Sequence, residues 1–203
     1  MTEHYYTRDP QVAHDLRRFT VRIGDKEFTF ETDAGVFGKR RLDPGTRLLL
    51  ESVALPSAGA VLDLGCGWGA IGTVVGARAP ACRVYLVDLN RRAVELARKN
   101  LALNGVTNGE VREGDGFAPL SGLRFDLILT NPPVRAGKAV LYRLLEEAAA
   151  HLVPGGRFVA VIGNKQGADS YRNKVREVFG NAADIGKGGG YRVIQAVQGD
   201  GGK

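Results

Sequence analysis

The sequence predicts an α/β fold, in which helices cover both faces of a mostly parallel β-sheet and an N-terminal β-hairpin and helix are added. From residue 60 onward, short apolar runs alternate with amphipathic segments, as in consecutive βαβ units. Before residue 40 the pattern differs, because apolar and polar residues alternate one by one around a turn. The hydrophobic content of 44% and the charged content of 25% are ordinary for a globular domain.

The first part of the chain is a predicted extension of the main domain. The stretch FTVRIGDKEFTF alternates on both sides of Gly24 and Asp25, which predicts a β-hairpin. In LDPGTRLLLESV, Asp43 suits an N-cap and Pro44 suits the first helical position, so a helix follows the hairpin. We expect residues 1–54 to pack on a domain formed by residues 55–203, so that the whole makes a single compact domain.

The remaining segments complete a sheet of seven strands. Strands are predicted at residues 60–65, 83–89, 109–115, 124–130 and 157–163, and helices at residues 70–79, 91–105, 139–152 and 170–180. Residues 182–198 predict a closing pair of strands that adds an antiparallel edge. Cys66 and Cys82 are expected to be separate buried thiols, and no histidine or cysteine spacing indicates a metal site.

Composition also bears on location and partners. No apolar run reaches the roughly 20 residues needed to span a bilayer, and the polar N-terminus has no signal-peptide core. We therefore expect a cytoplasmic protein without membrane contact. The net charge of +6 leaves two interpretations open, namely ordinary solvated surfaces or a polyanionic partner such as nucleic acid.

The stretch VLDLGCGWGAIG predicts a ligand-binding loop between the first strand of the main sheet and the helix after it. Glycines at positions 65, 67 and 69 let the backbone turn sharply and approach a ligand without an intervening Cβ. The ligand stays open at this point, because Gly67, Gly69 and Gly72 also satisfy the dinucleotide pattern G-x-G-x-x-G.

Acidic residues at the ends of three predicted strands bear on the choice between these ligands. Asp88 ends the second strand and suits a ribose, which NAD and S-adenosylmethionine share. Asp63 precedes the glycine loop, where a carboxylate opposes a pyrophosphate and favours a ligand with positive charge, such as a sulfonium. In EGDGF, Asp115 is placed to bond an adenine amine with Phe117 nearby, although a helix cap or turn is the alternative for Asp115.

The motifs DLGCGWG, VDLN, GDGF and TNPP occur in this order and resemble those of class I S-adenosylmethionine-dependent methyltransferases. More narrowly, HYY, FTFETDAGVFGKRRLDPGTRLLLE and NPPVRAGK resemble the RsmC-type small-domain family of rRNA guanine-N2 methyltransferases. This resemblance covers essentially the whole chain. It implies a Rossmann-like fold, S-adenosylmethionine as cofactor, and 16S ribosomal RNA of the small subunit as substrate. It also implies a cofactor site formed by Asp63, Gly65, Gly67, Gly69, Asp88, Leu89, Asp115, Gly116, Phe117 and Asn131.

The Asn-Pro-Pro corner carries the chemistry that the resemblance implies. Proline fixes φ and disfavours a helical conformation in the residue before it, so Asn131 and Pro132 are held extended. The side-chain oxygen of Asn131 and the carbonyl of Pro132 would accept the two N–H bonds of the target amine, leaving its lone pair facing the methyl group. Asn131 and Pro132 are therefore the predicted catalytic residues.

The substrate side of the predicted site lacks an aromatic residue after the corner, where Val134 stands. We expect base stacking from Phe37, with Tyr5 or Tyr6 as alternatives, and phosphate contacts from Arg135 and Lys138. Longer members of the family have a second, degenerate copy of the domain, which this sequence lacks. We therefore expect a monomer or a homodimer.

Three other functions remain open from the sequence. An Asn-Pro-Pro corner also suits a protein glutamine amide or adenine N6 as methyl acceptor. An NAD-dependent oxidoreductase is opposed by Asp63 and by the lack of a hydride-acceptor site. A binding module with residual cofactor affinity is opposed by the intact Asp63, Asp88 and Asn131.

Overall fold

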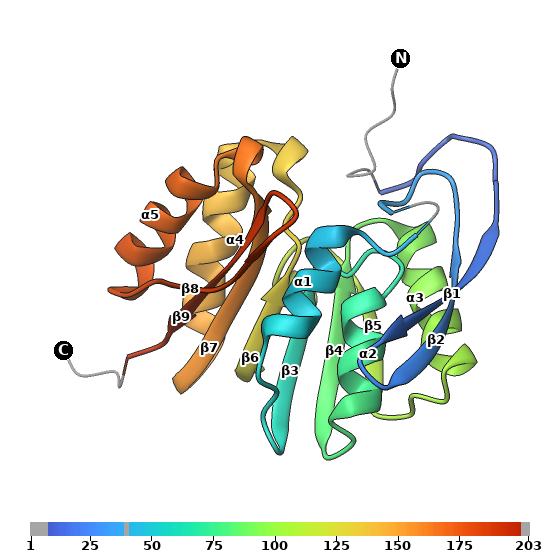
Figure 1. Ribbon diagram of the computed structural model, residues 1–203, viewed down its shortest axis with the longest axis horizontal. Helices are drawn as coiled ribbons and strands as arrows, with labels where there is room; N and C mark the ends of the chain where they lie inside the picture. Colours follow the sequence, from blue (N-terminus) through green and yellow to red (C-terminus); the bar gives the residue numbers. More distant parts are fainter. Residues whose placement is uncertain (1–7, 39–40, 200–203) are drawn as a thin grey trace.

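The computed structural model describes residues 8–38 and 41–199, and its main feature is a seven-stranded sheet (Figure 1). The strands lie in the order β5-β4-β3-β6-β7-β9-β8. All pairs from β5 to β7 are parallel, which confirms the predicted mostly parallel α/β sheet. The strands are β3 (Gly59–Leu64), β4 (Cys82–Asp88), β5 (Gly109–Glu113), β6 (Phe125–Thr130), β7 (Leu152–Gly163), β8 (Ala183–Gly188) and β9 (Tyr191–Val197).

The closing hairpin differs in one detail from the expected antiparallel edge. The antiparallel strand, β9, lies between β7 and β8, so the outermost strand β8 runs in the same direction as the parallel strands. The physical reason is that β9 carries more apolar side chains than β8, so β9 takes the buried position inside the sheet. Val193, Ile194 and Ala196 of β9 are fully buried, whereas β8 has no buried residue. Gly189 and Gly190, both with positive φ, make the tight turn between the two strands.

Helices cover both faces of the sheet, as Figure 1 shows, because side chains of each strand alternate between two apolar cores. Val61 of β3 belongs to the core under α1 (Pro44–Ser52), α2 (Ala70–Arg78) and α3 (Arg91–Leu103). Leu62 and Leu64 belong to the opposite core under α4 (Lys138–His151) and α5 (Ala168–Phe179). Within the described residues, no helix has the length and apolar character to cross a membrane.

The N-terminal hairpin consists of β1 (Arg17–Ile23) and β2 (Lys26–Thr32), as predicted. Asn100 of α3 and Asn104, the C-cap residue of that helix, close the free edge of β2. The Asn104 side chain accepts from the Thr29 amide at 3.0 Å and donates to the Thr29 carbonyl at 2.8 Å. The Asn100 side chain likewise accepts from the Glu31 amide at 2.7 Å and donates to the Glu31 carbonyl at 2.9 Å. The side chains of Asn100 and Asn104 thus replace a neighbouring strand, and they fix the hairpin on the helix layer.

Candidate active site

A cavity lies at the carboxyl ends of the central parallel strands, where chain segments from distant parts of the sequence meet. β3 has β4 on one side and β6 on the other, so the strand order reverses at this point. Open α/β sheets bind ligands at such a reversal. The cavity brings together ten predicted site residues, which are Phe37, Gly65, Gly67, Asp88, Leu89, Asp115, Gly116, Asn131, Pro132 and Val134.

The glycine loop after β3 leaves open space where side chains would otherwise stand. Gly65 and Gly67 have φ of 68° and 55°, a region that other residues rarely adopt. A Cβ on either glycine would meet no atom within 4 Å, although both residues line the cavity. The loop therefore offers its bare backbone to a ligand.

Asp88 holds this loop from the end of β4. One carboxylate oxygen accepts from the Gly67 amide and the other from the Asn90 amide, both at 2.8 Å. Burial holds the pKa of Asp88 above its ordinary value, although these backbone hydrogen bonds oppose that shift. Each oxygen keeps a further lone pair, so the carboxylate can also accept from the two hydroxyls of a ribose.

Asp63 lies behind the loop rather than against the cavity. Its side chain is buried, and one oxygen accepts from the Gly72 amide in the first turn of α2 at 2.8 Å. Burial raises the pKa of Asp63 to about 7, the hydrogen bond from Gly72 opposes that shift, and the charge of Asp88 adds to it. The carboxyl group of Asp63 thus lies under the start of α2, and Asp63 is not among the residues that line the cavity.

Gly69 and Phe117 also lie outside the cavity lining. Gly69 has φ of 83°, and a Cβ there would approach the Cβ of Ala97 to 2.9 Å, so this glycine permits close packing of α2 on α3. The buried ring of Phe117 stacks on His151 at a centroid separation of 4.4 Å. Asp115 does line the cavity, and both its oxygens accept from Arg143, at 2.8 and 3.0 Å.

The Asn-Pro-Pro corner lines the same cavity as the glycine loop. The Asn131 Nδ2 donates to Asp43 Oδ2 at 3.0 Å and to Thr46 Oγ1 at 2.9 Å. The Pro132 carbonyl accepts from the Val134 amide at 2.8 Å, and Pro133 between them has φ −75° and ψ 75°, an inverse γ-turn. This turn fixes the direction of the Pro132 carbonyl and leaves it one lone pair.

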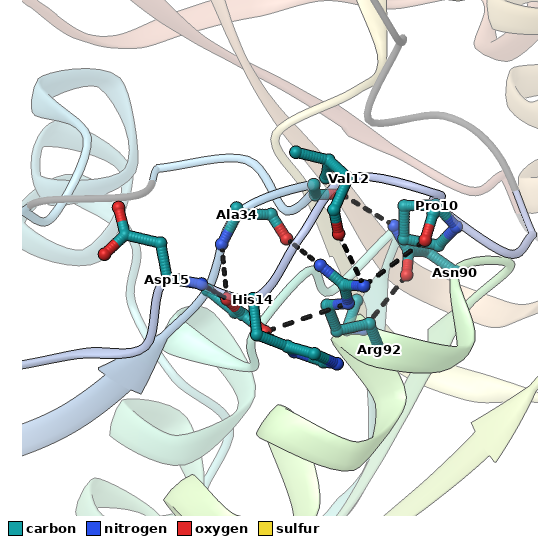
Figure 2. Close-up of polar contacts among 10 residues, drawn as sticks. Pro10, Val12, His14, Asp15, Ala34, Asn90 and Arg92 are labelled. Atoms are coloured by element: carbon teal, nitrogen blue, oxygen red, sulfur yellow. Dashed lines mark hydrogen bonds and ion pairs between the residues drawn. The ribbon is translucent and has the colours of Figure 1, made fainter.

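The loop that carries Phe37 is tied to the main domain at several points. Trp68 Nε1 donates to the Phe37 carbonyl at 2.7 Å, and Asn90 Nδ2 donates to the Gly35 carbonyl at 2.9 Å. Figure 2 shows the guanidinium of Arg92 among the carbonyls of Pro10, Val12 and Ala34. Phe37 is 41% exposed and is among the residues that line the cavity.

The predicted phosphate contacts lie beside the cavity. Arg135 and Lys138 are exposed and follow Val134, which lines it. Neither side chain makes an ion pair or hydrogen bond within the part of the chain that the structure describes. Tyr5 and Tyr6, the alternative stacking residues, lie outside the described residues. Cys66 and Cys82 are free and buried as expected, and the described residues contain no cluster that could hold a metal.

Several cavity residues were not predicted from the sequence. Thr46 stands three positions after the predicted cap Asp43, so the capping motif was the available signal. Asn90 caps α3 through the Ala93 amide, which is a similar local signal. Gln166 and Tyr191 reach the cavity from the end of β7 and from β9, and no local pattern marks them.

Comparison with known proteins places this cavity in context. The family described as methyltransferase small domain matches residues 27–195. "Uncharacterized protein YbxB" of Bacillus subtilis is 40% identical, over 97% of this chain and 98% of that protein. Ribosomal RNA small subunit methyltransferase C of Chromohalobacter salexigens is 37% identical, over 96% of this chain and 59% of that protein.

Among solved structures, the 16S rRNA N2 methyltransferase RsmC of T. thermophilus, in complex with AdoMet and guanosine, is similar with a TM-score of 0.81. It is 31% identical, and the match covers 93% of this chain and 52% of that one. The chain therefore spans a little over half the length of these two RNA methyltransferases.

Proposed function

Because the chain belongs to the methyltransferase small domain family, we propose that it transfers a methyl group from S-adenosylmethionine to the exocyclic N2 amine of a guanine in ribosomal RNA of the small subunit. The observation that carries the proposal is the position of the Asn131-Pro132 corner in the same cavity as the glycine loop. A cofactor on the loop and an amine at the corner would then face each other. The names of the relatives from Chromohalobacter and T. thermophilus support the guanine and the 16S RNA.

The cofactor side of the cavity fits S-adenosylmethionine. The open space over Gly65 and Gly67 accommodates the chain of a ligand that lies against the backbone. Asp88 would accept from the ribose hydroxyls, and Leu89, Asp115 and Gly116 would surround the adenine. S-adenosylmethionine supplies an electrophilic methyl group on its sulfonium sulfur.

The corner would act on the acceptor amine by orientation and polarisation. A guanine amine is a poor nucleophile because its lone pair is delocalised into the ring. Acceptance of its two N–H bonds by Asn131 Oδ1 and the Pro132 carbonyl would pull the nitrogen toward tetrahedral geometry, with the lone pair directed at the methyl carbon. Such preorganised contacts are worth several kcal/mol. The proton of the product ammonium then passes to water.

The surroundings of the cavity favour RNA over a protein acceptor. Arg135 and Lys138 follow the cavity residue Val134 in the sequence, and Lys165 precedes the cavity residue Gln166. The three cations are exposed and have no anionic partner among residues 8–38 and 41–199, so they are available to phosphates. Phe37 would stack on the target base, and Val134 would contact it at the corner.

The test uses small ribosomal subunits that lack the modification, together with methyl-labelled S-adenosylmethionine. We expect the wild type to label 16S RNA at a guanine N2, as mapped by nuclease digestion and mass spectrometry. Asn131→Ala should lower the rate by about 10²–10³-fold, because one oriented acceptor is lost. Calorimetry should give the variant an unchanged affinity for S-adenosylmethionine.

Asn181→Ala is the matched control, since among the described residues this exposed asparagine is hydrogen-bonded only to Phe179 and Val197. It should methylate at the wild-type rate. Label found only in ribosomal protein would replace the proposal by a protein amide acceptor, and label at adenine N6 would replace it by that base. Binding of NAD without binding of S-adenosylmethionine would contradict methyl transfer altogether.

A further inference from the structure

The hydrogen bonds of Asn131 determine which of its side-chain atoms faces the cavity. An amide nitrogen has two hydrogens, and here the acceptors for both are Asp43 Oδ2 and Thr46 Oγ1. The reverse orientation would place the amide oxygen against a carboxylate that can only accept. The side-chain oxygen of Asn131 makes no hydrogen bond among the described residues, and it belongs to a side chain that lines the cavity.

Asp43 is itself held in place by the fold. The same oxygen that accepts from Asn131 accepts from the Thr46 amide at 2.9 Å, which makes Asp43 the N-cap of α1. The side chain of Tyr191 on β9 lies beside Asp43, and burial together with the charge of Asp43 raises the pKa of the tyrosine hydroxyl. Gly45 allows the ring to lie there, because a Cβ at that position would approach Tyr191 Cδ1 to 2.7 Å.

We infer that Asp43 and Thr46 are positioning residues of the methyl transfer, which orient and polarise the Asn131 amide so that its oxygen becomes the acceptor for the substrate amine. This inference rests on the proposed function of Asn131. The amide oxygen gains electron density when a carboxylate accepts from the amide nitrogen, because amide resonance couples the two atoms. A hydrogen bond to a charged group strengthens that effect. The start of α1, which lies far from Asn131 in the sequence, therefore belongs to the active site.

Two substitutions separate this role from the folding of α1. Thr46→Val removes the hydroxyl that accepts from Asn131 but keeps the backbone amide that Asp43 caps. Asp43→Asn keeps a side chain of equal N-cap preference and removes the charge. For both variants we expect kcat to fall by about tenfold or more, with the KM for S-adenosylmethionine and for the small subunit within about twofold of wild type.

Thr20→Val is the control, because it also removes a threonine hydroxyl from a hydrogen bond, the one to Thr29 on the hairpin. It should keep the wild-type kcat. If Thr46→Val and Thr20→Val have equal kcat, or if Thr46→Val changes only the melting temperature, the positioning role is wrong.

A second readout does not depend on activity. In ¹⁵N-edited NMR spectra, the two side-chain amide protons of Asn131, identified by their loss in Asn131→Ala, should exchange slowly with water. Thr46→Val should accelerate that exchange. Exchange in the wild type as fast as in a free asparagine would overturn the inference. Slow exchange in a protein that labels no RNA would instead contradict the proposed function and leave the orientation of Asn131 established.

Discussion

Arg92 joins the loop before Phe37 to the start of α3, and Arg92→Met tests how much the protein depends on that junction. The Arg92 side chain is 13% exposed and that of Asp33 is 1% exposed, and 3.7 Å separates their nearest nitrogen and oxygen. The guanidinium also donates to the carbonyls of Ala34 at 2.7 Å and Val12 at 3.0 Å. Methionine keeps an unbranched apolar stem and removes every donor.

The expected cost follows from what the substitution leaves behind. Removing one partner of a buried ion pair costs about 3–5 kcal/mol. Asp33 keeps hydrogen bonds from the Asp15 and Ala34 amides and from His14, and, against the effect of burial, these hold its pKa below the ordinary value. We therefore expect the lower end of this range, a loss of about 3 kcal/mol in the free energy of unfolding. For a chain of this size, that loss corresponds to a fall of about 6–12 °C in melting temperature.

The assay is urea unfolding followed by circular dichroism, with Arg91→Met as the matched control. Arg91 is the preceding residue of α3, but its side chain is 53% exposed and its ion pairs to Asp9 and Glu113 are 3.5 and 3.6 Å long. Such surface pairs contribute less than about 1 kcal/mol. If Arg92→Met destabilises the protein no more than Arg91→Met, the buried junction does not hold the loop.

Three further substitutions test other features of the site. The folded-state pKa of Asp63, about 7, lies above the ordinary 3.8, so the folded protein binds the extra proton and its stability falls as the pH rises between these values. Asp63→Asn does not titrate, and its free energy of unfolding relative to wild type should increase over that pH range and then level off; a constant difference would contradict the burial of a neutral carboxyl. Gly72→Ala would push a Cβ into Leu86 and should cost about 1–3 kcal/mol in urea unfolding while S-adenosylmethionine affinity persists in the folded protein. Gly65→Ala should cost about 1–2 kcal/mol in free energy of unfolding because of the positive φ, and, unlike Gly72→Ala, it should greatly weaken cofactor binding in calorimetry. Wild-type affinity in this variant would show that the loop is not the cofactor site.

Local patterns predicted the fold well because each element depends on neighbours in the sequence. The hairpin around Gly24, the Asp43 cap and the glycine loop all have short-range causes, and the structure has each where it was expected. The mostly parallel sheet followed from the alternation of strands and helices. The position of β9 was not predictable in the same way, because its pairing with β7 is decided by burial across the sheet.

The candidate site was predicted less completely, and Asp63 shows why. Side chains of a strand alternate, so Asp63 points to the same face as Val61, where α2 covers it, while Leu62 and Leu64 point to the other face. Proximity in sequence to the glycine loop therefore did not mean contact with the cavity. The support of Asn131 by Asp43 was also invisible, because 88 residues separate them.

The support of Asn131 has a consequence for the newly made chain. The glycine loop follows β3 and Asp88 ends β4, so both lie in the first half of the sequence. Asp43, which accepts from Asn131, lies in turn beside Tyr191 of β9, the last strand of the sheet along the chain. A growing chain therefore contains the glycine loop and Asp88 well before the surroundings of the Asn131 amide are complete. We expect the protein to gain its activity only when synthesis has passed β9. Activity would then indicate that the whole sheet has formed.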